Sequence, residues 1–200
     1  AILQMDGERI PIEIPLAGEH MVYNAMAAAS VGRMLGLDSE EIRTGLKMVQ
    51  PVDGRSNIIK LADRTVIDDC YNANPVSMKA AIDLLDTAYT RKVAILGDMF
   101  ELGENEAGMH ADVGAYIADR KIDCTICVGE LSRSMYQAAM ENARKRGTNN
   151  NGNIHYFADK EKMFNKLPVL LERGDTVLVK ASHGMGFSEI VSFLNKIERK

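Results

Sequence analysis

Most of the residues that could do chemistry fall in three polar segments, and each segment directly follows a short apolar run. The segments are residues 68–75, 97–103 and 180–186. In open α/β sheets, ligands bind beyond the carboxyl ends of the strands, because side chains and helix N-termini converge there. If the three apolar runs are neighbouring strands, the three segments together form a ligand site.

The first segment begins with two adjacent carboxylates, Asp68 and Asp69. They repel each other unless one faces solvent or a ligand, and the paired hydroxyls of a ribose are such a ligand. Asn74 followed by Pro75 is typical of a helix start, so we favour a helix N-cap over ligand binding for Asn74. Asp98, taken alone, fits a role in its own turn, because aspartate accepts hydrogen bonds from nearby backbone N–H groups.

The third segment joins a basic residue to a glycine-rich turn. Lys180 at a strand end is predicted to be a solvated charge, as most lysines are. Gly184 and Gly186 lead into a helix whose N-terminus favours anions. The dinucleotide fingerprint is not matched, because Glu189 stands where the third glycine belongs. The sequence also contains no Gly-x-x-x-x-Gly-Lys-[Ser/Thr], so it has no P-loop of its own.

The histidines and cysteines do not predict a metal site. No two histidines have metal-ligand spacing, and His110 lies on the apolar face of a predicted helix, which favours a partly buried, hydrogen-bonded histidine. Cys124 and Cys127 have C-x-x-C spacing, but residues three apart on a strand point to opposite faces. We therefore predict buried thiols. Three cysteines are too few for a disulfide scaffold, which fits a reducing cytoplasm.

Strand-like apolar runs alternate with helical patterns from about residue 54 onward. A predicted hairpin over 57–61 and 64–69 comes first. The alternation predicts an α/β fold: a Rossmann-like, mostly parallel sheet with helices on both faces. The predicted helices cover 75–89, 106–121, 131–146, 160–171 and 187–198, and the strands cover 92–97, 123–128, 154–157 and 175–180, with a polar loop over 149–153.

Residues 1–52 show a different pattern. One strand and two helices bury too little apolar surface to fold alone, so we predict the trailing part of a larger domain, with 53–200 as the next domain. The boundary signal is Pro-Val-Asp-Gly at 51–54. The first residue, Ala1, favours a fragment, and Ser39 is the predicted N-cap of the second helix. The predicted elements are a strand over 10–14 and helices over 23–35 and 39–49.

Composition and charge exclude several classes of protein. The 24 Lys+Arg and 28 Asp+Glu residues give a formal net charge of −4 at pH 7, and no dense basic block occurs. Neither nucleic acid nor an anionic membrane surface is therefore an expected partner. The longest apolar runs, such as residues 93–96, fall far short of the roughly 20 residues of a membrane-spanning helix. No signal peptide is visible. These features predict a globular cytoplasmic protein.

Five motifs occur in a fixed order along the chain, and together they resemble the Mur ligases of peptidoglycan synthesis. The resemblance covers about residues 10–198 and is most specific for the branch that adds D-alanyl-D-alanine. It implies a three-domain enzyme, with 1–52 as the end of the central P-loop ATPase domain and 53–200 as the C-terminal Rossmann-like domain. The motifs are Gly18-Glu-His20-Met-Val-Tyr-Asn24, Gly54-Arg55, Ile67-Asp-Asp69-Cys-Tyr-Asn72-Ala-Asn-Pro75, Leu96-Gly-Asp98-Met-Phe-Glu101-Leu-Gly103 and Val177-Leu-Val-Lys180-Ala-Ser182.

The resemblance also implies a reaction, ATP-dependent amide formation through an acyl phosphate. ATP and Mg²⁺ are the implied cofactors. The implied substrates are UDP-N-acetylmuramoyl-tripeptide and D-alanyl-D-alanine, and the enzyme is expected to be a monomer. This chain alone is expected to be inactive, because the P-loop and most magnesium ligands would lie upstream. Closure of the domains onto ATP is expected, with Gly54 and its neighbours as the hinge.

Residue roles carry over from the resemblance position by position. His20 and Asn24 would lie near the adenine, Arg55 would reach the phosphates, and Asp69 would hold the ribose hydroxyls. The implied substrate-binding residues are Asn72, Asn74, Asp98, Lys180, Ser182 and His183.

Two positions depart from the family pattern. Met21 replaces a second Asn, which shifts adenine recognition toward Asn24. His183 stands where an Arg is frequent, so that arginine cannot anchor a substrate carboxylate here. Two alternatives stay open: a sibling ligase that adds a different amino acid, and a Rossmann-like module that binds nucleotide without catalysis.

Overall fold

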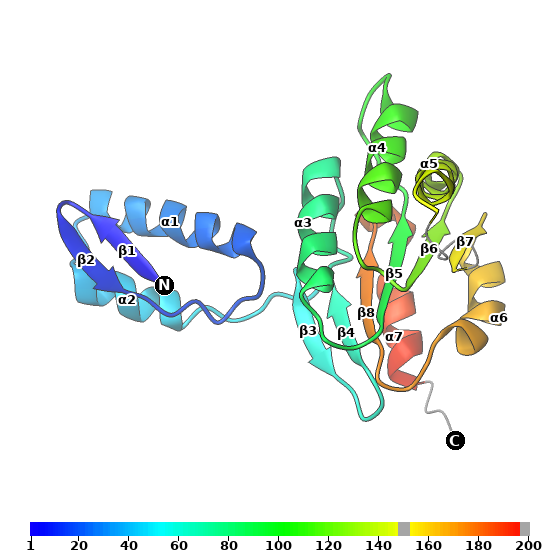
Figure 1. Ribbon diagram of the computed structural model, residues 1–200. Helices are drawn as coiled ribbons and strands as arrows, with labels where there is room; N and C mark the ends of the chain where they lie inside the picture. The colour runs from blue at the N-terminus through cyan, green and yellow to red at the C-terminus, as the bar shows by residue number, and fades with distance from the viewer. Residues whose placement is uncertain (148–152, 197–200) are drawn as a thin grey trace. The chain divides into compact units, whose positions relative to one another are not determined.

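The computed structural model describes residues 1–147 and 153–196 and divides into two compact units, Ala1–Val52 and Asp53–Lys200 (Figure 1). Two sequence predictions fall partly outside the described residues. These are positions 149–152 of the polar loop and positions 197–198 of the last helix.

The larger unit is built on a six-stranded sheet with the strand order β3-β4-β8-β5-β6-β7. Strand β3 is antiparallel to β4, and every other neighbouring pair is parallel. The predicted α/β fold with a mostly parallel sheet is confirmed, including its opening hairpin. The strands are β3 (Asn57–Lys60), β4 (Thr65–Asp68), β5 (Lys92–Gly97), β6 (Cys124–Val128), β7 (Ile154–Phe157) and β8 (Thr176–Lys180).

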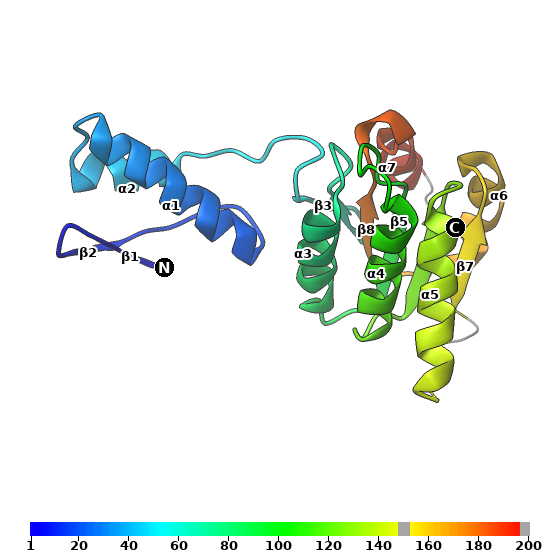
Figure 2. The ribbon, with the colours of Figure 1, turned by 90° about the horizontal axis from the view of Figure 1, so that it is seen from above.

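Helices cover both faces of this sheet, with α3, α4 and α5 on one side and α6 and α7 on the other (Figure 2). A membrane-crossing helix is absent from residues 1–147 and 153–196, since no helix there combines the required length with sufficient hydropathy. The bounds are α3 (Pro75–Asp86), α4 (Glu106–Ala118), α5 (Ser132–Lys145), α6 (Lys160–Leu170) and α7 (Ser188–Lys196).

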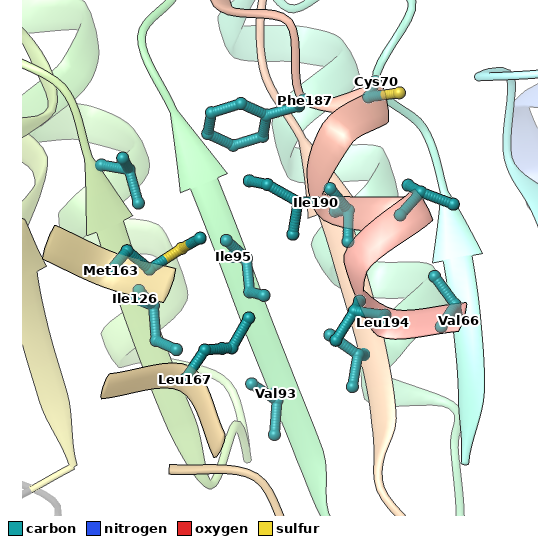
Figure 3. Packing of buried hydrophobic residues seen from close by; sticks show 14 of the residues in the cluster. Val66, Cys70, Val93, Ile95, Ile126, Met163, Leu167, Phe187, Ile190 and Leu194 are labelled. Carbon is teal, nitrogen blue, oxygen red and sulfur yellow. The ribbon is translucent and has the colours of Figure 1, made fainter. Parts of the chain in front are cut away.

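Each face of the sheet has its own hydrophobic core. Ile95 of β5 packs with Leu167 of α6 and Ile190 of α7 on one face (Figure 3). On the other face, Leu96 packs with Ile82 of α3, because successive residues of a strand point to opposite sides. The sheet is therefore buried on both faces, which fixes the ends of its central strands in place.

The two cysteines of β6 point to opposite faces, as predicted. Cys124 belongs to the core under α6 and α7, and Cys127 to the core under α3, α4 and α5. Burial raises the pKa of Cys124 to about 11 and that of Cys127 to about 12. Burial, followed by a hydrogen bond to Asp68, raises the pKa of Cys70 to about 12. All three thiols are protonated at neutral pH and serve as core side chains.

Asn74 begins helix α3 as its N-cap. Its side chain accepts a hydrogen bond from the backbone N–H of Ser77 at 2.8 Å, and Ser77 Oγ accepts one from the backbone N–H of Asn74 at 3.1 Å. The helix ends at Asp86 rather than at the predicted residue 89. Thr87 ends it, because its backbone N–H and hydroxyl both donate to the carbonyl oxygen of Leu84.

The smaller unit is a two-stranded hairpin and two helices around a small core of its own. The prediction of a strand over 10–14 was wrong in its bounds and missed the first strand of the pair. The core joins Leu3 and Ile10 of the hairpin to Ala29 and Ile42 of the helices. The elements are β1 (Ile2–Met5), β2 (Glu8–Pro11), α1 (Glu19–Met34) and α2 (Ser39–Lys47).

The N-cap of α2 is Asp38, and the prediction of Ser39 was wrong. Asp38 has an extended backbone, and its carboxylate accepts a hydrogen bond from the N–H of Glu41 at 2.8 Å. Glu41 returns the bond by accepting from the N–H of Asp38 at 2.9 Å. Ser39 is the first helical residue, and its hydroxyl donates to the carboxylate of Glu8 instead. Asp38, one residue before Ser39, therefore caps helix α2.

Candidate functional site

The structure brings the three polar segments together at the carboxyl ends of β4, β5 and β8. They enclose a cleft of about 460 Å³. This volume lies within the roughly 300–1,000 Å³ that is usual for small-molecule sites. The lining residues are Tyr71, Asn72, Ala73 and Asn74 after β4, Phe100, Glu101 and Leu102 after β5, and Ser182, His183 and Gly184 after β8.

The segment 54–56 is fastened to the end of β4 by the two adjacent aspartates. Asp68 Oδ2 accepts a hydrogen bond from the N–H of Gly54 at 3.1 Å, and Asp69 Oδ1 accepts from the N–H of Ser56 at 2.8 Å. The N–H of Tyr71 donates to the carbonyl oxygen of Gly54 at 2.9 Å. Gly54 has a φ of +73°, and a Cβ there would lie 3.1 Å from the backbone nitrogen of Tyr71, so glycine suits both the conformation and the approach.

This fastening places Arg55 beside the cleft. Its guanidinium carbon lies 4.0 Å from the centroid of the Tyr71 ring, a cation–π contact, and the arginine is otherwise exposed. The Tyr71 ring also lies near His183, with the two ring centroids 5.6 Å apart. A delocalised cation thus stands next to a cleft-lining aromatic ring, free to meet an anion from solvent.

Lys180 is buried, and the prediction of a solvated charge was wrong. Its side chain is 3% exposed, and Nζ donates to Asp69 Oδ2 at 2.6 Å and to the carbonyl oxygen of Asn72 at 2.9 Å. A buried ammonium needs such acceptors, because desolvating an unpaired charge is costly. Lys180 therefore links β8 to the loop after β4, and it does not line the cleft.

Asp98 is also buried and stands apart from the cleft lining. Its Oδ1 accepts from both the N–H and the hydroxyl of Ser132, at 2.7 and 2.6 Å, at the start of α5. Its carboxylate lies so close to Gly129 that a Cβ at that position would collide with it. The N–H of Ser182 donates to the Asp98 carbonyl oxygen at 2.9 Å. The residue thus joins β5, β8 and α5 through one side chain and one carbonyl.

Ser182 and His110 hold the loop after β5 from two sides. Ser182 Oγ accepts a hydrogen bond from the N–H of Phe100 at 2.8 Å. The N–H of Met99 donates to His110 Nε2 at 2.9 Å, so the Nδ1 proton must be the one that bonds the carbonyl oxygen of Glu106 at 2.7 Å. His110 is hydrogen-bonded, as predicted, and it is fully rather than partly buried.

His20 and Asn24 lie in the smaller unit, one turn apart on α1. Asn24 is exposed, and its Nδ2 donates to the sulfur of Met21 at 3.6 Å. A Cβ on Gly18 would lie 2.5 Å from His20 Cε1, so glycine at the N-cap leaves room for this imidazole. Spacing of i and i+4 puts both polar side chains on one helix face.

The family comparison covers the unit that carries the cleft. The family described as "Mur ligase, glutamate ligase domain" matches residues 54–183. The chain belongs to the Mur ligase family. The match includes all three segments that line the cleft, except for the glycine at 184.

Curated Mur ligases resemble the chain over nearly its whole length. It is 35% identical over 184 residues to the UDP-N-acetylmuramoyl-tripeptide–D-alanyl-D-alanine ligase of Bacillus subtilis, covering 90% of this chain and 39% of that protein. Identity to the ligase of the same name from Escherichia coli is 32% over 197 residues, covering 97% of this chain and 41% of that protein. This Mur ligase chain therefore spans about two fifths of the length of these relatives.

Solved Mur ligase structures share the fold. A MurF crystal structure from Acinetobacter baumannii matches with a TM-score of 0.87 and 28% identity, over 98% of this chain and 42% of that one. MurF from Thermotoga maritima, solved in complex with ADP, matches with a TM-score of 0.77 and 22% identity, over 98% and 42% of the two chains.

Several residues that line the cleft of this Mur ligase chain were not among the sequence candidates. They are Tyr71, Phe100, Glu101 and Leu102. Glu101 carries the clearest signal in the sequence, because it lies in the polar segment after the buried strand β5, two residues before Gly103. Its φ of +62° is unusual for a residue with a side chain. Such strain concentrates at functional sites.

Proposed function

We propose that this chain is the C-terminal part of an ATP-dependent ligase that adds D-alanyl-D-alanine to UDP-N-acetylmuramoyl-tripeptide. In this proposal, Ala1–Val52 is the end of the central ATP-binding domain and Asp53–Lys200 belongs to the C-terminal domain. The cleft at the ends of β4, β5 and β8 is the observation that carries the proposal, together with the shared name of the curated relatives.

The cleft is suited to the incoming amine substrate. Its lining mixes three large apolar side chains, Tyr71, Phe100 and Leu102, with amide, hydroxyl and charged groups. The methyl groups of two alanines can pack against the large apolar side chains. The charged ends of a free dipeptide can form hydrogen bonds with the polar groups of the lining. In the proposed reaction, the dipeptide binds here and its amino group, after losing a proton, attacks the carbonyl carbon of the acyl phosphate of the tripeptide. The amide C–N bond forms, the C–O bond to the phosphate breaks, and inorganic phosphate leaves as the nitrogen loses a second proton.

ATP is the proposed cofactor, and it supplies the phosphoryl group that turns the tripeptide carboxylate into an acyl phosphate. The residues of the larger unit suit a nucleotide: Arg55 presents an exposed guanidinium for phosphate oxygens. Asp69 Oδ2 accepts from Lys180 and has a further lone pair for a ribose hydroxyl. His20 and Asn24 are proposed to contact the adenine.

Magnesium is assigned no ligand in this chain. Among residues 1–147 and 153–196, no group of three His, Cys, Asp or Glu side chains is placed to hold a metal ion. We propose that the Mg²⁺ ligands, the P-loop and the tripeptide site belong to the part of the ligase that this chain does not span. The reaction is proposed to occur in the cytoplasm, with a monomeric enzyme, and the isolated chain is proposed to be inactive.

A chimeric ligase tests the proposal. The corresponding C-terminal part of the Bacillus subtilis enzyme is replaced by this chain, and phosphate release is measured with ATP, UDP-N-acetylmuramoyl-tripeptide and an added amine. We expect turnover with D-alanyl-D-alanine and none with D-alanine, L-lysine or diaminopimelate alone. Turnover with a single amino acid instead would identify a sibling ligase.

A binding measurement distinguishes the proposed ligase from the non-catalytic nucleotide-binding module. Titration of the isolated chain with D-alanyl-D-alanine, followed by amide NMR shifts, should move signals of the residues after β4, β5 and β8. Two results together would identify a Rossmann-like module without catalysis. The isolated chain would bind ADP but no dipeptide, and the chimera would show no turnover.

A further inference from the structure

The cleft contains one carboxylate that has no partner within the described part of the chain. Glu101 is exposed and lines the cleft, and no hydrogen bond or ion pair joins it to residues 1–147 or 153–196. The other acidic groups nearby are engaged, since Asp69 pairs with Lys180 and Asp98 accepts from Ser132. Glu101 is therefore the acid at this site that remains available to a ligand.

The position of Glu101 is fixed by its surroundings. The two residues before it are held by Ser182 Oγ and His110 Nε2, both buried and both bonded to backbone N–H groups. The ring of Phe100 also packs against the loop after β8, where a Cβ on Gly184 would lie 3.1 Å from it. Glu101 then adopts the left-handed conformation. A backbone held this firmly in a costly conformation directs its side chain reproducibly.

The lining contains a single acid, Glu101, and a single base, His183. An unpaired carboxylate in this lining is complementary to an ammonium group and is unsuited to a polyphosphate, which a carboxylate repels. The amine substrate in the proposed function is a zwitterionic dipeptide. Its ammonium is the one cationic group that the reaction brings to the cleft as a small molecule.

We propose that Glu101 binds the ammonium group of the incoming dipeptide and so positions its nitrogen in the cleft. The inference rests on the proposed function, because it names the contact by which that site recognises a free amino terminus. The contact is a charge-assisted hydrogen bond, which is stronger than one between neutral groups. It also makes binding tighter for a dipeptide with a free amino group than for one whose amino group is blocked.

The test measures dissociation constants of the isolated chain by NMR titration with D-alanyl-D-alanine and with N-acetyl-D-alanyl-D-alanine, which lacks the ammonium. The variants are Glu101→Gln and Glu101→Gly, the latter free of backbone strain at a positive φ. Glu104→Gln is the matched control, because Glu104 is exposed nearby and does not line the cleft.

We expect both Glu101 variants to bind the dipeptide at least tenfold more weakly, and the control to bind it as the wild type does. The acetylated dipeptide should bind wild type and Glu101→Gln with equal affinity. If the wild type binds the dipeptide and Glu101→Gln binds it with the same dissociation constant, this inference alone is overturned. A wild-type chain that binds nucleotide but no dipeptide would overturn both this inference and the proposed function.

Discussion

Lys180 Nζ lies 2.6 Å from Asp69 Oδ2, and the two side chains are 3% and 13% exposed. The same ammonium donates to the carbonyl oxygen of Asn72, so it joins the end of β8 to the residue after β4 and to the loop that follows. A residue that sequence analysis treats as a surface charge thus organises the loop that carries the cleft-lining Tyr71 and Asn72.

Replacing Lys180 by Met should destabilise the fold strongly, because Asp69 then keeps a largely buried charge without its counter-ion. Breaking a buried pair in this way costs about 3–5 kcal/mol. Urea unfolding followed by circular dichroism measures the change. Lys121→Met, at an exposed position without a partner in the described chain, should stay within about 0.5 kcal/mol of wild type. A loss below 1 kcal/mol for Lys180→Met would contradict the structural role.

Arg55→Ala should weaken nucleotide use without affecting folding. The guanidinium is exposed and contacts one aromatic face, so its removal costs little stability. In the chimeric ligase, we expect the KM for ATP to rise about tenfold or more, as a lost charge-assisted contact to phosphate predicts. Arg133→Ala, an exposed arginine on α5, is the control. An unchanged KM for Arg55→Ala would remove the phosphate assignment.

His110→Ala should lower stability by about 2–4 kcal/mol, because it leaves the buried N–H of Met99 without an acceptor and opens a cavity. Thermal or urea unfolding measures the loss. His155→Ala, at a half-buried position on the edge strand β7, should cost clearly less. Equal losses at both positions would show that the hydrogen bond of His110 contributes little.

The cysteines should resist modification in the native state. At pH 8, a thiol with a pKa of about 11 is ionised in roughly one molecule per thousand, and Cys70 and Cys127 are ionised even less. A thiol reagent such as dithionitrobenzoate should therefore react with none of the three until guanidinium unfolds the chain. Rapid reaction of any thiol in the folded chain would contradict this burial.

The same thiols predict a loss of stability at alkaline pH. In the unfolded chain a thiol ionises near pH 8.5, whereas the folded state keeps the proton to a pKa of about 11 or 12. The folded state thus binds more protons, so the free energy of unfolding falls as pH rises above about 9. The slope is about 1.4 kcal/mol per pH unit and thiol. In Cys124→Ala, this slope should be smaller between pH 9 and 10, as measured by urea unfolding.

The larger unit was predictable because its strands are continuous apolar runs and its helices carry apolar faces. The predicted strand over 154–157 matches β7, and helix α4 begins at Glu106 as predicted. Helix ends were less predictable. Local hydrogen bonds, such as that from Thr87 to Leu84, decide where a helix ends. In the sequence, they are harder to recognise than the regular spacing of apolar residues.

The first strand of the smaller unit was missed although its turn is visible in the sequence. Asp6 and Gly7 both have positive φ, of 51° and 81°, between β1 and β2. An Asp-Gly pair between alternating apolar residues is a strong hairpin signal. The Asp6-Gly7 pair therefore predicts a two-stranded hairpin at the start of the smaller unit, in place of a single strand.

The interior of the site could not be predicted from local pattern. Lys180 and Asp69 are 111 positions apart in the sequence, and Asp98 and Ser132 are 34 apart. Only the folded sheet brings these groups together and decides which polar side chains are buried. The direction of Glu101 likewise depends on Ser182 and His110, which lie on other elements.

Segment 54–56 belongs to the larger unit and is held there by hydrogen bonds to the end of β4. Rotation about the backbone of Gly54 would break the hydrogen bonds to Asp68 and Tyr71, whereas Val52 and Asp53 make none in the described chain. Gly54 is thus part of the wall that carries Arg55. The position of Arg55 beside Tyr71 is therefore set by backbone hydrogen bonds within the larger unit.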